Sequence, residues 1–177
     1  MNKLLATIIT MTLFIISFCA YGQKENVEKN INESFRYLKK ARSSVEDALK
    51  DIKNAYSEHS IADIQDYASK AKSNIDDAMT YAKKARNEAR DAESEASNIK
   101  CTDAESNASY SENYFDKSDR EFDDAFKALI KATSVDDKNE LMEYIRKAVN
   151  SIEDGKSYLK KADNSLNDTL DDLNKCK

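Results

Sequence analysis

Apolar and small residues recur at alternating spacings of three and four along nearly the whole chain after residue 24. They form four consecutive stretches, over residues 27–55, 61–99, 108–132 and 141–176. A repeat sustained at 3.5 residues is typical of long helices that pack along a narrow apolar stripe and cross at roughly 20°. We therefore predict an all-α fold, an elongated antiparallel four-helix bundle with coiled-coil-like heptad packing.

The repeat breaks at three short polar segments that contain helix-capping residues. Ser60 and Asp63 are spaced to begin the second helix, and Thr102 and Glu105 form a capping-box sequence before the third. A polar group at 134–137 can cap the fourth helix. Connections this short force neighbouring helices to run antiparallel.

The second half of the chain resembles the first. A shift of 77 residues, without a gap, aligns residues 34–87 with residues 111–164, and 18 of these 54 positions are identical. The matches include lysines on the polar faces, which a shared apolar repeat alone would not produce. We infer two tandem similar helical hairpins, spanning about 24–100 and about 102–177.

One substitution between the two copies concerns the apolar stripe itself. Gly155 of the second copy replaces Ala78 of the first. Glycine inside a helix costs about 1 kcal/mol relative to alanine. The replacement therefore indicates either a close approach of two helices or simple drift after duplication.

The first 22 residues have the composition of a cleavable signal peptide. A basic residue precedes an apolar run over residues 4–18, and small residues lie at positions −3 and −1 of a cut after Gly22. That run is shorter than the roughly 20 residues that span a membrane. Cys19 follows a bulky aromatic residue, whereas lipid anchoring needs a small one. We expect 1–22 to be removed and 23–177 to be exported, periplasmic or secreted, without a lipid anchor or stable membrane insertion.

The composition of the chain favours uninterrupted helices with a solvated surface. Proline is absent, and Gly155 is the one glycine after residue 22. Residues 23–177 carry 27 basic and 33 acidic side chains, a net charge of −6. We expect no nucleic-acid partner, because nucleic acids select surfaces with clustered lysine and arginine.

Two cysteines remain after residue 22, and each follows the second helix of its hairpin. In an antiparallel bundle these two helix ends lie at the same pole, so Cys101 and Cys176 can form a disulfide in an oxidising compartment. No Cys-x-x-Cys spacing is present to activate either thiol. We predict a structural disulfide between them.

Four tyrosines occupy equivalent positions, one in each predicted helix. Each is followed by Lys at +3, a small residue at +4 and Asp at +10, and the two of each hairpin are equally distant from its turn. They are Tyr37, Tyr81, Tyr114 and Tyr158. We expect the rings to pack at the margin of the core with their hydroxyl groups in water. The alternative is a site for a small apolar ligand between the helices, with the four tyrosines around it.

The residues needed for catalysis or for metal and cofactor binding form no recognisable pattern. His59, the only histidine, lies in a predicted turn. The aspartates at +10 are spaced as solvated partners of lysines: Asp47, Asp91, Asp124 and Asp168. No Gly-rich phosphate loop, calcium loop or nucleophile beside a base is present in the sequence.

We therefore expect no enzymatic activity, no metal and no cofactor. The long charged faces favour a structural or protein-interaction module, whose partner is an unknown protein or a second copy of the chain. The alternative is a carrier of a small apolar ligand bound between the helices. Fold alone does not decide between these functions.

Overall fold

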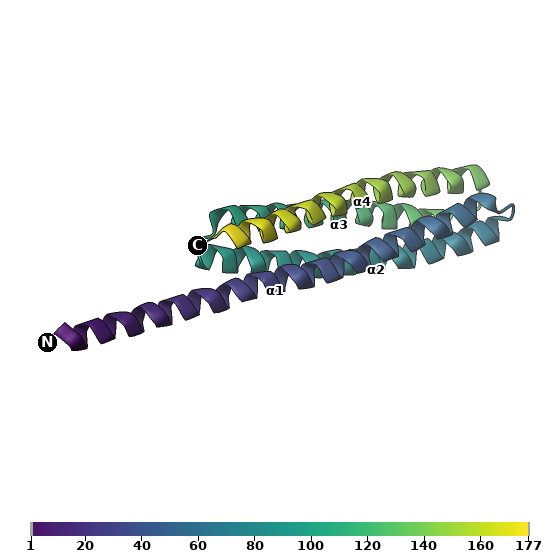
Figure 1. The fold of residues 1–177 in the computed structure, drawn as a ribbon. Coiled ribbons are helices and arrows are strands. Elements are labelled where there is room, and N and C mark those ends of the chain that lie inside the picture. Colours follow the sequence, from purple (N-terminus) through teal and green to yellow (C-terminus); the bar gives the residue numbers. More distant parts are fainter. Residues whose placement is uncertain (1, 177) are drawn as a thin grey trace.

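The structure, a computed structural model, describes the backbone of residues 2–176 and the side chains of residues 22–176. It has four α-helices: α1 (Asn2–Ser57), α2 (Ile61–Asn98), α3 (Thr102–Ala132) and α4 (Lys138–Lys175). α1 pairs with α2 and α3 pairs with α4, so two antiparallel hairpins lie side by side in one elongated bundle (Figure 1). The predicted all-α bundle of two hairpins is confirmed. The side chains of residues 1–21, Cys19 among them, lie outside the described part.

A single core runs along the bundle. Nearly all apolar positions of the repeat belong to this core and have exposed fractions of 0–2%, whereas Ile61, Ile99 and Cys176 at the ends of the stretches are partly buried. α2 contributes mainly alanines to this core, whereas α3 contributes the rings of Phe115 and Phe122 and α4 contributes leucines and isoleucines. The core therefore combines large side chains with the small ones of α2, and small side chains let helices approach each other closely.

Each hairpin has a buried hydrogen bond between its two helices, at the equivalent position. In the first, Ser34 Oγ donates to the Ala85 carbonyl oxygen at 2.8 Å. In the second, Ser111 Oγ lies 3.5 Å from the Ala162 carbonyl oxygen and also donates to the Asn107 carbonyl oxygen at 3.1 Å. The 77-residue shift maps Ser34 onto Ser111 and Ala85 onto Ala162, so the two copies resemble each other in a specific contact as well as in sequence.

Removing this hydroxyl group should lower the free energy of unfolding more in the first hairpin than in the second. We expect Ser34→Ala to lower the free energy of unfolding by about 1 kcal/mol, since it deletes a short buried hydrogen bond between helices. Ser111→Ala should cost less, because its contact across the hairpin is longer. Urea unfolding followed by circular dichroism tests both. The exposed Ser43→Ala is the control, expected to stay within about 0.5 kcal/mol of the wild type; a larger loss for Ser111→Ala than for Ser34→Ala would contradict the geometry.

Two of the three predicted helix starts agree with the structure. Ser60 Oγ accepts a hydrogen bond from the Asp63 backbone N–H at 3.2 Å, and Asp137 Oδ1 accepts one from Glu140 at 2.9 Å. The capping box predicted for Thr102 is wrong, because the N-cap of α3 is Cys101, whose side chain makes no capping hydrogen bond. The turn before α3 sets this start.

The α2–α3 connection reverses the chain through a lysine in the left-handed conformation. Lys100 has φ of 58°, and its N–H donates to the Ser97 carbonyl oxygen at 3.0 Å, while Cys101 N–H donates to the Ala96 carbonyl oxygen at 2.9 Å. This pair of bonds is the Schellman helix ending, in which glycine is the usual residue at the left-handed position. It leaves Cys101 buried beside the end of α4.

The predicted disulfide is supported by the structure. Cys101 and Cys176 lie at disulfide distance, with their Cα atoms 5.8 Å apart. The bond would join the N-cap of α3 to the C-cap of α4. It therefore closes the open end of the second hairpin, and no matching link exists for the first among the residues described.

At the opposite pole the two turns are tied to each other. Gln65 Nε2 donates to the Val135 carbonyl oxygen at 2.9 Å, and Lys138 Nζ donates to the His59 carbonyl oxygen at 3.1 Å. Each bond joins the start of one hairpin's second helix to the turn of the other hairpin. The pole therefore fixes the hairpins relative to each other.

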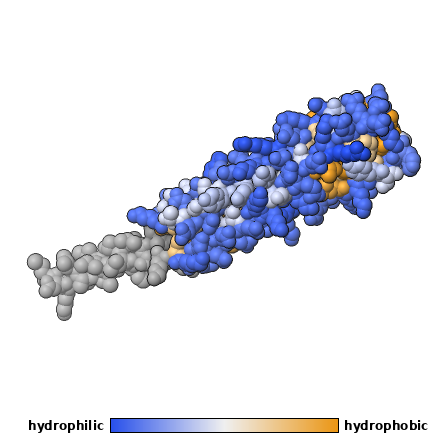
Figure 2. All heavy atoms as spheres, turned by 90° about the horizontal axis from the view of Figure 1, so that it is seen from above, coloured by the Kyte–Doolittle hydropathy of each residue, from blue (hydrophilic) through white to orange (hydrophobic). Residues whose placement is uncertain are grey.

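The surface is mostly hydrophilic, with hydrophobic side chains gathered near the pole that holds the turns (Figure 2). Leu49 and Phe126, which flank the apolar stripes, are half-buried and pack against the core. Tyr56 and Ile130, in the last turns of α1 and α3, are 44% and 42% exposed. The first pair therefore widens the core, and the second pair remains available for contact.

Candidate functional site

The predicted tyrosines of the first hairpin form one cluster with two lysines. Lys40 Nζ lies 5.8 Å from the ring centroid of Tyr37 and 5.4 Å from that of Tyr81. Lys84 Nζ lies 5.8 Å and 5.7 Å from the same two centroids. Both rings are half-buried at the α1–α2 seam, and both ammonium groups are exposed above them. Such cation–π contacts are worth about 0.5–1 kcal/mol each at exposed sites.

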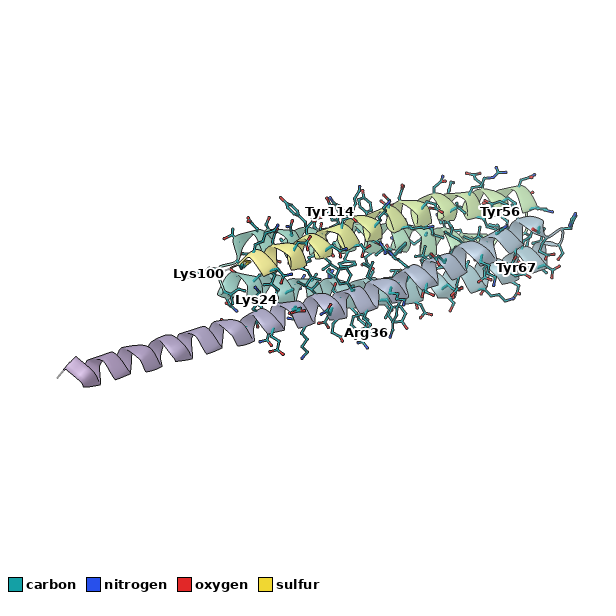
Figure 3. All side chains as sticks on the ribbon, in the orientation of Figure 1. Lys24, Arg36, Tyr56, Tyr67, Lys100 and Tyr114 are labelled. Atoms are coloured by element: carbon teal, nitrogen blue, oxygen red, sulfur yellow. A yellow bond between two sulfur atoms is a disulfide. The ribbon has the colours of Figure 1, made fainter. Side chains whose placement is uncertain are left out.

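The second hairpin builds the same cluster on the other side of the bundle. Lys117 Nζ lies 5.5 Å and 5.9 Å from the centroids of Tyr114 and Tyr158, and Lys161 Nζ lies 4.8 Å from that of Tyr158. In Figure 3, Tyr114 lies on the opposite side of the bundle from Arg36, whose guanidinium stacks on Tyr37 at 4.7 Å.

The structure therefore brings the four tyrosines together as two pairs, one per hairpin. Each pair is half-buried at the margin of the core and is covered by lysine side chains. Tyr67 with Lys70 and Tyr144 with Lys147 repeat the contact nearer the turns, at 4.7 Å and 5.2 Å. In each hairpin the tyrosine rings and the aliphatic parts of the lysine side chains cover the seam between the two helices.

A row of ion pairs closes the seam between α2 and α3. Three basic residues of α2 face three acidic residues of α3, in the pairs Lys83–Asp119, Arg86–Asp116 and Arg90–Glu112. The Arg90 guanidinium uses two nitrogens on one Glu112 carboxylate oxygen. A network of this kind holds its side chains in place better than isolated exposed pairs do.

Burial affects one member of this row. Asp119 is half-buried, and burial raises the pKa of its carboxyl above the usual 3.8, although Lys83 and Arg86 act in the opposite direction. A carboxyl whose pKa is raised on folding binds protons more tightly in the folded than in the unfolded chain. The stability of the fold should therefore rise as the pH falls through the raised pKa, until the pH is below the ordinary value.

We expect acidification to stabilise the wild type through Asp119 and to do so less in Asp119→Asn. Burial likewise raises the pKa of Glu88 and Glu121, so part of the gain should remain in the variant. Urea unfolding between neutral pH and the ordinary carboxyl pKa measures the slope in both proteins. An equal slope in the variant would show that Asp119 does not contribute.

The largest cavity described lies between α1 and α4, the two helices that contact each other least among neighbouring helices. It is an open groove of about 560 Å³, and charged side chains dominate its lining: Arg42, Glu46, Glu153, Lys156, Ser157, Lys160, Asp163 and Asn164. Arg42 bridges it, with a guanidinium nitrogen 3.1 Å from an Asp163 carboxylate oxygen and 3.4 Å from the Leu159 carbonyl oxygen.

The α1–α4 seam is open because it lacks most of the ion pairs that close the α2–α3 seam. Under the 77-residue shift, the pairs that close the α2–α3 seam correspond to Lys160 with Arg42, Asp163 with Lys39, and Asn167 with Phe35. Only the second of these combines opposite charges. Two of the three ion pairs therefore have no counterpart between α4 and α1.

This groove was not predicted from the sequence, although the sequence contains a signal for it. The alignment of the two copies was used to find identical residues, whereas the groove lies where the charges of equivalent residues differ. A comparison of charge at equivalent positions would have shown that acidic residues of α3 correspond to Phe35, Lys39 and Arg42 of α1.

The remaining candidate residues lie apart from the groove chemistry. The aspartates at +10 are all exposed, and Oδ1 of Asp124 lies 3.8 Å from Nζ of Lys127. His59 is exposed in the α1–α2 turn. The side chains that the structure describes include no group of three or more potential metal ligands. Within the part of the chain that the structure describes, no helix is long and apolar enough to cross a membrane.

Comparison with known proteins adds no identity to this description. No protein-family model, no curated protein and no solved structure matches the chain.

Proposed function

We propose that this chain is a non-enzymatic, exported helical-bundle protein that acts as a structural or protein-interaction module. The observation that carries the proposal is the groove between α1 and α4. Its lining includes four charged side chains, Glu46, Glu153, Lys156 and Lys160, for which the described residues provide no ion-pair partner. Charged groups arranged along two long helices suit recognition of another polypeptide, because complementary charges fix the register of two chains.

The alternative, a carrier of a small apolar ligand, has less support. Small-molecule sites are usually concave and mainly apolar, with a few polar groups. The tyrosines that would line such a site instead form two separate pairs beneath lysine side chains. The largest cavity described is open to solvent, and charged side chains dominate its lining. If the chain is a carrier, replacing all four tyrosines by Phe should reduce ligand retention without loss of helicity.

A photo-reactive amino acid in the groove tests the interaction module directly. Ser157 lines the groove, and its side chain is exposed. Thr80 is its equivalent on α2, 77 residues earlier, and is also exposed. We expect irradiation of cells that export the protein to give a discrete protein adduct from position 157 and none from position 80.

Two results would contradict the proposal. The first is an adduct of equal yield from both positions, which would mean random collision. The second is a purified wild-type protein that carries a stoichiometric small molecule in native mass spectrometry and gives no protein adduct. That second result would favour the carrier.

A further inference from the structure

The two residues of the Cys101–Cys176 pair differ in their access to solvent. Cys101, the N-cap of α3, is 1% exposed. Cys176, the C-cap of α4, is only partly buried at the edge of the core. In thiol–disulfide exchange an external thiolate must reach the sulfur that it attacks, so access decides which of the two sulfurs reacts. The accessible residue of this pair is Cys176.

The ends of the two helices favour the same direction of reaction. Cys101 lies at the N-terminus of α3, where the helix dipole stabilises the negative charge of a departing thiolate. Cys176 lies at the C-terminus of α4, where the dipole disfavours that charge. The burial of Cys101 and the acidic residues of the first turn of α3, Asp103 and Glu105, reduce this effect. Access is therefore the main determinant, and the helix ends add to it.

We propose that the Cys101–Cys176 bond is a thiol-exchange site, at which a small external thiol becomes attached to Cys176. The attacking thiolate forms a new S–S bond with Sγ of Cys176, and the original S–S bond breaks. Its electron pair leaves on Sγ of Cys101, which then takes a proton from water. The external thiol is oxidised to a mixed disulfide as Cys101 is reduced, so the step needs no other reactant. Because Cys176 is itself partly buried, a small thiol reaches it more readily than a cysteine on a folded protein does.

The packing of this pole should make the exchange reversible. Leu173 is 2% exposed, and Asn107 Nδ2 of α3 donates to an Asp172 carboxylate oxygen of α4 at 2.9 Å. These contacts would keep Cys176 near Cys101 after the bond opens. The Cys101 thiolate can then attack the mixed disulfide and expel the small thiol. We therefore expect the adduct to accumulate only while the external thiol is in excess, or when Cys101 is replaced.

The position of the adduct in the wild type tests the proposal. The folded, oxidised protein is mixed with excess glutathione, and at early times the free thiols are blocked with N-ethylmaleimide during unfolding. Peptide mass spectrometry should find glutathione on Cys176 with maleimide on Cys101, in at least about tenfold excess over the reverse arrangement. The same reaction in guanidinium chloride is the control. It should give similar yields of the two arrangements, because unfolding removes the difference in access.

Two single variants provide a matched pair that measures each cysteine alone. Folded Cys101→Ser should form a mixed disulfide with oxidised glutathione at least about tenfold faster than folded Cys176→Ser does. The two rates should converge in guanidinium chloride. Circular dichroism verifies that both variants keep the helicity of the wild type.

Three results would overturn the proposal. The first is an exported protein in which both cysteines are free thiols. The second is glutathione that attaches mainly to Cys101, or equally to both residues, in the folded protein. The third is a bond that no thiol opens until the protein is unfolded. None of these results bears on crosslinking from position 157, so the interaction module is tested separately.

Discussion

Replacing Gly155 by alanine should destabilise the bundle, although alanine is the better helix former. A Cβ atom at this position would overlap Cε1 of Phe122 and would lie 2.7 Å from its Cδ1. The ring is fully buried, so it cannot swing aside without displacing other core residues. Overpacking typically costs 1–3 kcal/mol, against a gain of about 1 kcal/mol in helix propensity. We expect a net loss of up to about 2 kcal/mol in the free energy of unfolding, measured with urea.

The first hairpin provides the compensating change. The positions equivalent to Phe122 and Gly155 hold Val45 and Ala78, both buried. Phe122→Val alone should leave a cavity and cost about 2–4 kcal/mol. The double variant Phe122→Val with Gly155→Ala should lose less than the sum of the two single variants, by at least about 1 kcal/mol. Additive losses, or a Gly155→Ala variant that is more stable than the wild type, would show that the ring does not require the glycine.

Loss of the bond between Cys101 and Cys176 should have the largest effect on stability. The two residues are 75 positions apart. Closing a loop of this length is worth about 4.5 kcal/mol on the chain-entropy model, less any strain. We expect the oxidised protein to melt roughly 9–18 °C above the same protein treated with a thiol reductant. Differential scanning calorimetry of both forms measures the difference.

The control is Cys101→Ser with Cys176→Ser, which should melt near the reduced wild type and should not respond to reductant. Hydrogen exchange locates the effect. The last turns of α4 should lose protection on reduction, because the bond fixes that end of the helix to the start of α3. Unchanged melting on reduction would mean that the bond adds nothing to the packed poles.

The sequence predicted those parts of the fold that depend on the spacing of apolar residues. The core positions of α2, such as Ile64, Ile75 and Ala92, follow from the repeat alone, because a helix with one apolar stripe has one way to bury it. The caps at Ser60 and Asp137 follow from local chemistry, since a side-chain oxygen reaches a nearby backbone N–H whatever the rest of the fold does.

Features that depend on contacts between helices were harder to predict. The start of α3 follows from the left-handed Lys100, a conformation for which glycine is the usual signal and lysine is not. The meaning of Gly155 became clear only from the position of the Phe122 ring, on another helix. To predict the groove, one must know which faces of α1 and α4 meet, and the spacing of apolar residues does not specify these faces.

The position of the Cys101–Cys176 bond also gives the two hairpin turns different topological roles. A protease cut between α3 and α4, at residues 133–137, would leave both helices covalently joined through the sulfurs. A cut between α1 and α2, at residues 58–60, would leave α1 held only by packing. A single cleavage in the first turn would thus convert the protein into a split molecule, from which α1 could be exchanged for a labelled copy of itself.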